Sequence, residues 1–424
     1  LNRLGRTSEE RLSKAPTEKE KGFVRAAEAF AFTDGSLGEK RLAWMFAMED
    51  LYQKFPEDRE VAAFYAVSML SGATVSADNR VLNNFLTESG TEISMRAGAI
   101  AMDIFRENPN HPGAAHYIIH AFDHPTYAPL ALSAAEKYAS IAPAVSHARH
   151  MPTHIFIQHG MWDRVSEWND SAFLAGQALW VPGDSAGDQN HSSDWGQYGD
   201  IQLGDLERSK LWIERATEVL ANNPGDPRSA GTLRTMKARH IIETENWEIS
   251  ELTDDLNGEE LLALGLSAAN MNQLELAERV ANRFAELLSQ SPNNAGLTLM
   301  HAEVAGLTKF KQGEEEEAFA LLNEAVNLTE QQTPPRGAAS PLKPVHELTA
   351  DVFLASGDYE KAAELYEASL RRMANRPRAL LGAARSYAGL GDNYNARLNY
   401  QAFYTLWNDD NLAEVQEAKT YLRL

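Results

Sequence analysis

The chain of 424 residues contains no cysteine, which excludes disulfide bonds and thiolate-bound metals from its chemistry. Apolar runs of the length needed to cross a bilayer are also missing, so we expect no membrane insertion. Acidic residues outnumber basic ones: the chain has 60 Asp and Glu and 39 Lys and Arg, which gives a net charge of −21. Nucleic-acid affinity comes largely from clustered positive charge, so this balance argues against a nucleic-acid partner.

Motifs that would identify a reaction are missing as well. The chain has no phosphate-binding P-loop and no G-x-G-x-x-G turn. Two H-x-x-x-H pairs are present, but Tyr117 and Met151 stand where an H-E-x-x-H protease carries glutamate. The sequence therefore leaves open whether the protein is an enzyme.

Strand signals are nearly absent, and alanine-rich segments with helical spacing alternate with short Gly, Asn, Asp and Pro breaks. The clearest case is "TADVFLASGDYEKAAELYEASLRRMANRP" followed by "ALLGAARSYAGLGDNYNARLNYQAFYTLW". Their turn glycines, Gly357 and Gly391, are 34 residues apart (391 − 357). Similar turns are expected at Gly160, Gly204 and Gly313. This pattern resembles the tetratricopeptide repeat, which implies an all-α solenoid of helical hairpins forming a right-handed superhelix.

The repeats and breaks predict a domain organisation. A charged N-terminal helical segment is expected to precede a repeat array that contains histidine-rich units. A linker, acting as a hinge or a cover, is expected to follow the array and to precede a final repeat pair. These parts span 1–40 for the N-terminal segment, 41–328 for the array, 109–215 for the histidine-rich units, 329–344 for the linker and 345–424 for the final pair. Turn formers in "ALWVPGDSAGDQNHSSDW" (178–195) predict an inserted loop beside the histidine units. Trp180 and Trp195 flank that loop, either as packing between repeats or as the lining of a ligand cleft.

The histidines follow the same period. "HYIIHAFDHP" contains His116 and His120, "HARHMPTHIF" contains His150 and His154, and the two pairs are 34 residues apart (150 − 116). Residues four apart share one face of a helix. Counted from the turn glycines, further polar residues fall on equivalent positions: His147, His191, Asp123, Asp194 and Tyr198. The repeat resemblance implies that these positions line the concave groove.

Imidazoles converging from neighbouring helices form a reasonable ligand set for a transition metal. Neutral imidazole suits zinc, copper, nickel or iron, and the absence of sulfur leaves Zn(II) or Cu(II) foremost. We expect His116, His120, His150 and His154 as primary ligands. Further ligands, or side chains that orient the ligands from behind, are expected to be His147, His191, Asp123, Asp194 and Tyr198. The alternative is a groove whose histidines bind a peptide, protein or small molecule without any metal.

The stretch from "HPGAAHYIIHAFDHP" to "HMPTHIF" also resembles a group of bacterial tetratricopeptide-repeat proteins with H-Y-x-I-H-A and H-M-P-[ST]-H-I-F motifs. The resemblance covers roughly residues 40–215. Members commonly begin with an exported leader and an additional repeat pair, so the resemblance favours export over a cytoplasmic location. It also implies that this chain is a fragment or a processed form. The group is known mainly by its repeats, so the resemblance implies a fold and no reaction.

Overall fold

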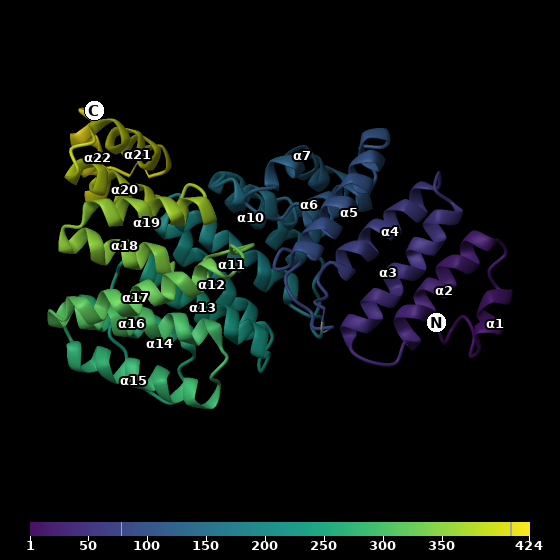
Figure 1. Ribbon diagram of the computed structural model, residues 1–424, viewed down its shortest axis with the longest axis horizontal. Coiled ribbons are helices and arrows are strands. Elements are labelled where there is room, and N and C mark those ends of the chain that lie inside the picture. Colours follow the sequence, from purple (N-terminus) through teal and green to yellow (C-terminus); the bar gives the residue numbers. More distant parts are fainter. Residues whose placement is uncertain (78, 408) are drawn as a thin grey trace. The chain divides into compact units, whose positions relative to one another are not determined.

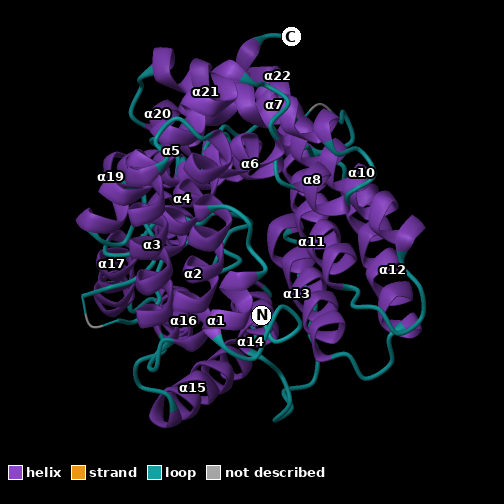
Figure 2. Cartoon of the chain, turned by 90° about the vertical axis from the view of Figure 1, so that its right-hand side faces the viewer, coloured by secondary structure: helices purple, strands orange, loops and turns teal. Residues whose placement is uncertain are grey.

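The protein is all-α in the computed structural model, which describes residues 1–77, 79–407 and 409–424. Within these ranges the extended pairing is limited to one isolated bridge between Val75 and Val81. Consecutive helices pack side by side as hairpins (Figure 1), and loops alone join them (Figure 2). Every helix of the described ranges is too short or too polar to span a bilayer.

The chain divides into two compact units, Leu1–Pro143 and Ala144–Leu424, each described by itself. The helices of the first unit are α1 (Ser8–Ser13), α2 (Glu18–Phe32), α3 (Leu37–Lys54), α4 (Arg59–Gly72), α5 (Glu88–Glu107), α6 (Pro112–Ala121), the short 3-10 helix η1 (Ala128–Ala131) and α7 (Leu132–Ile141). Those of the second unit are α8 (Ser146–His150), α9 (Thr153–Gln158), α10 (Trp162–Leu179), α11 (Gly187–Gln202), α12 (Leu206–Asn222), α13 (Pro227–Thr244), α14 (Gly258–Asn270), α15 (Leu274–Gln290), α16 (Ala295–Gln312), α17 (Glu315–Glu330), α18 (Val345–Ser356), α19 (Tyr359–Arg372), α20 (Pro377–Gly389), α21 (Asn393–Leu406) and α22 (Ala413–Leu422). The units divide the histidine-rich region expected at 109–215, and the domain boundaries expected from the sequence stay a prediction.

The turn glycines confirm the helical-hairpin repeat. Each of the five lies between two helices and has a positive φ. This conformation is unfavourable for a residue that has a Cβ atom. They are Gly160, Gly204, Gly313, Gly357 and Gly391. Each turn thus ends one helix and starts the next in the antiparallel direction, as the tetratricopeptide-like pattern requires.

The inserted loop expected at 178–195 is much shorter in the structure. Helix α10 ends at Leu179 and α11 begins at Gly187, so the histidine His191 lies on a helix. The Gly, Ser and Asp residues of this stretch favour turns, but tertiary hydrogen bonds outweigh that preference. The buried Asn190 amide donates to Ser229 Oγ at 2.8 Å, and the Gln197 amide donates to the Met236 carbonyl oxygen at 2.8 Å.

The helix expected to carry His150 and His154 is interrupted. Helix α8 ends at His150 and α9 begins at Thr153, with Pro152 between them. Proline has no N–H for the helical ladder, so one backbone hydrogen bond is missing here. Met151 and Pro152 nevertheless keep right-handed helical φ and ψ angles, so the two histidines lie on two short helices joined by helical backbone.

A buried ion-pair cluster joins distant repeats of the second unit. Arg376 caps the start of α20 and donates to Glu243 of α13 at 3.0 Å and to Glu347 of α18 at 3.0 Å. It also donates to the Tyr198 hydroxyl of α11 at 2.6 Å. All four side chains are almost fully buried. Nearby, the indole N–H of Trp162 donates to the Asn375 carbonyl oxygen at 2.8 Å.

The segment between α17 and α18 lies over the helices that carry the histidines. Gln158 donates its amide to the Pro335 carbonyl oxygen at 3.3 Å. A Cβ atom at Gly337 would lie 2.5 Å from the Trp195 ring, so the backbone rests directly on that indole. Of the two roles expected for 329–344, hinge or cover, this packing favours the cover.

We predict that Arg376→Met lowers the free energy of unfolding by about 3–5 kcal/mol, because Glu243 and Glu347 would stay buried without their cation. Urea denaturation followed by circular dichroism measures the change. The control is Arg371→Met, which removes an exposed arginine from the adjacent helix α19. A loss no larger than that of the control would contradict the prediction.

A second prediction concerns Glu303 of α16, whose carboxyl oxygens are buried without a hydrogen-bond partner among the described residues. Burial raises its pKa well above the usual value, more than Lys343 lowers it. The folded state keeps the proton while the unfolded chain releases it above about pH 4.3, so stability from this group falls as pH rises. Glu303→Met should therefore stabilise the protein more at pH 8 than at pH 5, as measured by urea midpoints. An equal gain at both values would refute this account.

Candidate metal centre

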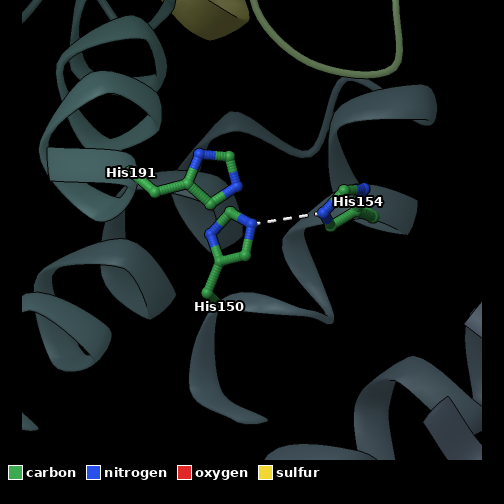
Figure 3. Close-up of side chains that lie close together, drawn as sticks. All are labelled: His150, His154 and His191. Carbon is green, nitrogen blue, oxygen red and sulfur yellow. Dashed lines mark hydrogen bonds between the residues drawn. The ribbon is translucent and has the colours of Figure 1, made fainter. Parts of the chain in front are cut away.

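Three histidines of the second unit come together. His150 of α8, His154 of α9 and His191 of α11 each place a ring nitrogen within 4.8 Å of the others (Figure 3). The Nε2 atoms of His150 and His154 are 3.2 Å apart, and the ring centroids of His150 and His191 are 4.2 Å apart. Among the described residues this is the group of His and acidic side chains with the spacing of a metal site.

The spacing suits a tetrahedral ion. Zinc–nitrogen bonds of about 2.0–2.1 Å at tetrahedral angles place two ligand nitrogens about 3.3 Å apart. The 3.2 Å between the Nε2 atoms of His150 and His154 matches that separation. Side-chain rotation can close the remaining spread of up to 4.8 Å across the three rings.

Asn169 of α10 fixes the orientation and the tautomer of His150. Its amide N–H donates to the Val165 carbonyl oxygen at 2.8 Å, which leaves the amide oxygen facing His150 Nδ1 at 2.7 Å. Nδ1 must then carry the proton and donate it to Asn169. The lone pair of His150 is on Nε2, the atom that faces His154, as a metal ligand requires.

The environment favours the uncharged form of His150 and His191. Burial lowers the pKa of His150 well below its usual value, and the neighbouring rings of His154 and His191 lower it further. Burial also lowers the pKa of His191, against the opposing effect of Asp194. A neutral imidazole has the free lone pair that binds a cation.

Trp195 covers one side of the three rings. Its ring centroid lies 4.8 Å from that of His150, 4.6 Å from that of His154 and 5.4 Å from that of His191. The indole therefore supplies an apolar wall that limits water on this side of the group. The structure shows Trp195 packed against the histidine rings, and its role as the lining of a ligand cleft stays a prediction.

Other residues expected at the site have different surroundings. His147 lies on α8, close enough for its charge to lower the pKa of both His150 and His191. Asp194 accepts from the Arg239 guanidinium at 2.6 Å. The Tyr198 hydroxyl accepts from Arg376, and burial raises the pKa of this tyrosine to about 12.

The first histidine pair lies in the other unit. His116 and His120 are on α6, with ring centroids 4.7 Å apart, and the His116 ring stacks on Tyr138 at 5.3 Å. Asp123 is buried just after the end of the same helix. That unit is described by itself, so the convergence of both pairs on one ion stays a prediction.

Sequence reasoning missed Asn169, although a signal was available. The residue lies four positions after Val165 and four before Phe173, on the buried face of α10. A polar side chain on such a face needs a hydrogen-bond partner. The sequence does not say which partner, because the contact with His150 depends on how α8 and α10 pack.

Comparisons with known proteins add no family. No protein-family model and no curated protein matches the chain. Among solved structures it is similar to a human IFIT1 dimer with m7Gppp-AAAA, at 12% identity over 94% of this chain and 83% of that one, with a TM-score of 0.38. It is also similar to the P58(IPK) TPR domain, at 13% identity over 89% of this chain and 99% of that one, with a TM-score of 0.28. A third structure, the APC/C hetero-tetramer Cut9-Hcn1, gives 10% identity over 97% and 85%, with a TM-score of 0.33. At these scores the likenesses carry no functional argument.

Proposed function

We propose that this tetratricopeptide-like repeat protein binds a transition-metal ion, zinc or copper, through His150, His154 and His191. The observation that carries the proposal is the 3.2 Å approach of two Nε2 atoms, with Asn169 holding the His150 lone pair toward His154. Without an ion, one of these nitrogens must donate to the other. With an ion, both donate their lone pairs to it.

Three histidines leave room for chemistry at the ion. A structural zinc is usually closed by four protein ligands, whereas a catalytic zinc has three and keeps one position for water or substrate. A water molecule bound there would lose a proton near neutral pH and become a nucleophile. His147, or the His116 and His120 pair expected from the sequence, would instead close the shell and give a structural role.

The alternative, a metal-free peptide groove, fits the geometry less well. A groove residue that reads a peptide has to present its polar atoms to the ligand. His150 is 2% exposed, and its Nδ1 is already bonded to Asn169. A buried ring held in one tautomer is the arrangement of a metal ligand rather than of a peptide contact.

We predict that the protein purified without chelator, or soaked with Zn(II) and Cu(II), carries about one equivalent of metal by mass spectrometry of the elements, because three neutral imidazoles complete most of a tetrahedral shell. His150→Ala with His154→Ala should abolish binding while circular dichroism shows unchanged helicity. Undiminished metal in this variant, or none in the wild type after soaking, would refute the site.

The matched control is the double variant His116→Ala with His120→Ala. Retained metal would show that the three histidines of the second unit suffice. Loss of metal in this variant as well would show that the first pair shares the ion, as the sequence predicts.

A further prediction tests whether the Asn169 side chain orients His150. Asn169→Ala should weaken metal affinity by about 10–100-fold, because His150 would lose the acceptor that fixes its tautomer. Asn169→Asp should preserve the affinity, since a carboxylate oxygen can accept the same N–H. Competition against a chromophoric chelator measures both. Asn223→Ala is the control, because Asn223 makes the same bond to a carbonyl oxygen four residues earlier without contacting a histidine.

A further inference from the structure

The cover segment, residues 331–344 between α17 and α18, makes a close contact with Trp195. An ideal Cβ atom at Gly337 would lie 2.5 Å from Cζ2, 2.8 Å from Cε2 and 3.2 Å from Nε1 of the Trp195 indole. Carbon atoms that are not bonded to each other pack best at about 3.5–4.0 Å. The indole therefore fills the space that a side chain at position 337 would need.

The backbone itself does not require a glycine at position 337. Turn glycines such as Gly313 and Gly357 have a positive φ, whereas Gly337 does not, so alanine could adopt its backbone conformation. The next two residues are Ala338 and Ala339, so the segment carries small side chains where it meets the indole. The close approach of the indole is therefore the constraint that leaves room for glycine alone.

Hydrogen bonds to carbonyl oxygens hold the cover segment on the N-terminal side of Gly337. The Arg372 guanidinium of α19 donates to the Gln332 carbonyl oxygen at 3.0 Å. The Gln158 amide of α9 donates to the Pro335 carbonyl oxygen at 3.3 Å. Both donors belong to helices, so they fix the backbone of the segment relative to the repeats on either side.

Burial and an ion pair hold the segment on the C-terminal side of Gly337. Leu342 is buried in the apolar core together with residues of α14, α16 and α18. The Lys343 ammonium group pairs with the Asp351 carboxylate of α18 at 2.6 Å. Proline limits the backbone further, because it fixes φ at residues 334, 335, 341 and 344. A segment that is held at both ends in this way keeps Gly337 in place against the indole.

We propose that the cover segment is a clamp, which through Gly337 holds the Trp195 indole against the metal-binding histidines. The ring centroid of Trp195 lies 4.8 Å from that of His150, 4.6 Å from that of His154 and 5.4 Å from that of His191. An apolar wall beside a metal site controls how much water reaches the ion. The clamp thus keeps water from the side of the ion that faces the indole. Its effect on the ion rests on the proposed metal site, whereas the position of the indole can be measured without a metal.

Nuclear magnetic resonance of the full chain, freed of metal with a chelator, tests the position of the indole. The resonance of the Trp195 indole N–H is assigned by its loss in Trp195→Phe. It should shift in Gly337→Ala, because the added Cβ atom has to displace the ring. The matched control is Gly231→Ala in α13, where a Cβ atom would meet open space, and it should leave the resonance in place. An unshifted resonance in Gly337→Ala would overturn the clamp, whether or not the protein binds a metal.

Zn(II) affinity, measured by competition against a chromophoric chelator, tests the effect on the ion. Gly337→Ala should weaken it by about tenfold, the scale of changes behind metal ligands, with the urea midpoint of the metal-free protein unchanged. In a Trp195→Phe background the same substitution should change the affinity by less than about threefold, because the smaller ring leaves room for the Cβ atom. A tenfold loss in both backgrounds, or in neither, would overturn the effect of the clamp on the ion.

The two experiments separate the clamp from the proposed metal site. A wild-type protein that binds no Zn(II) would refute the metal site and, with it, the effect of the clamp on the ion. The indole resonance of the Gly337→Ala variant would still decide whether the cover segment holds Trp195. A shifted resonance together with a tenfold loss of Zn(II) affinity that Trp195→Phe removes would uphold the whole proposal.

Discussion

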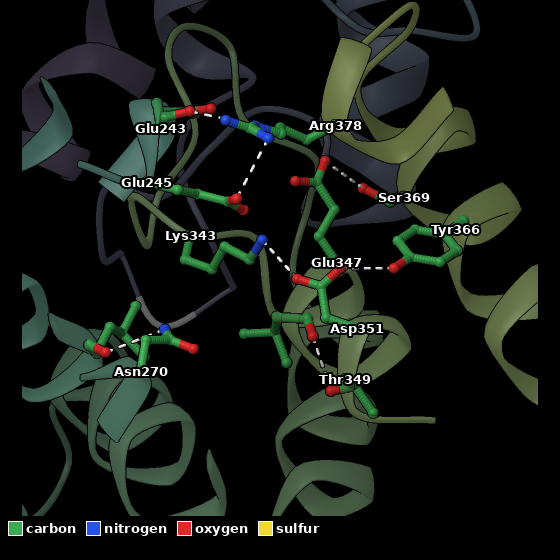
Figure 4. Close-up of polar contacts among 12 residues, drawn as sticks. Glu243, Glu245, Asn270, Lys343, Glu347, Thr349, Asp351, Tyr366, Ser369 and Arg378 are labelled. Atoms are coloured by element: carbon green, nitrogen blue, oxygen red, sulfur yellow. Dashed lines mark hydrogen bonds and ion pairs between the residues drawn. The ribbon is translucent and has the colours of Figure 1, made fainter. Parts of the chain in front are cut away.

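The guanidinium of Arg376, buried between the carboxylates of Glu243 and Glu347, links four helices of the second unit, α11, α13, α18 and α20. A buried charge is tolerated only when its hydrogen bonds are nearly complete, and Arg376 reaches both carboxylates and the Tyr198 hydroxyl. The carboxylate of Glu347 also accepts from Ser369, and Lys343 pairs with Asp351 beside it (Figure 4). Through these bonds α20 and α18 fix α11 and α13, the helices that carry His191, Trp195 and Arg239. The cluster therefore helps to position α11, which supplies His191 to the proposed metal site.

The histidine group spans the helical hydrogen bond that is missing at Pro152. Met151 and Pro152 keep helical φ and ψ angles, so His150 and His154 lie close to one face and their Nε2 atoms are 3.2 Å apart. Neighbouring side chains also hold His150. Asn169 holds the His150 ring from behind, and Thr153 donates its hydroxyl to the His150 carbonyl oxygen at 2.7 Å. His150, the buried ring of the three, is thus oriented by a side chain of the neighbouring helix α10.

The sequence predicted the hairpins and much of the histidine group because both follow the 34-residue period. Turn glycines show in the sequence, and counting from them puts His150, His154 and His191 at positions of adjacent repeats that are expected to line one groove. The contacts that order the site were not predictable in this way. Asn169 meets His150 through the packing of two helices, and Arg376 meets Glu243 across 133 residues of sequence. Short sequence patterns predict local structure, whereas contacts between distant residues depend on how successive repeats stack on one another.

Trp195 limits how a substrate could reach the proposed ion. Its indole contacts all three histidine rings, so it covers one side of the group. His150 is buried, whereas His154 and His191 are partly exposed. A substrate atom would therefore approach the ion from the side of His154 and His191. A catalytic metal site needs one such open side, whereas a structural site is closed by protein ligands.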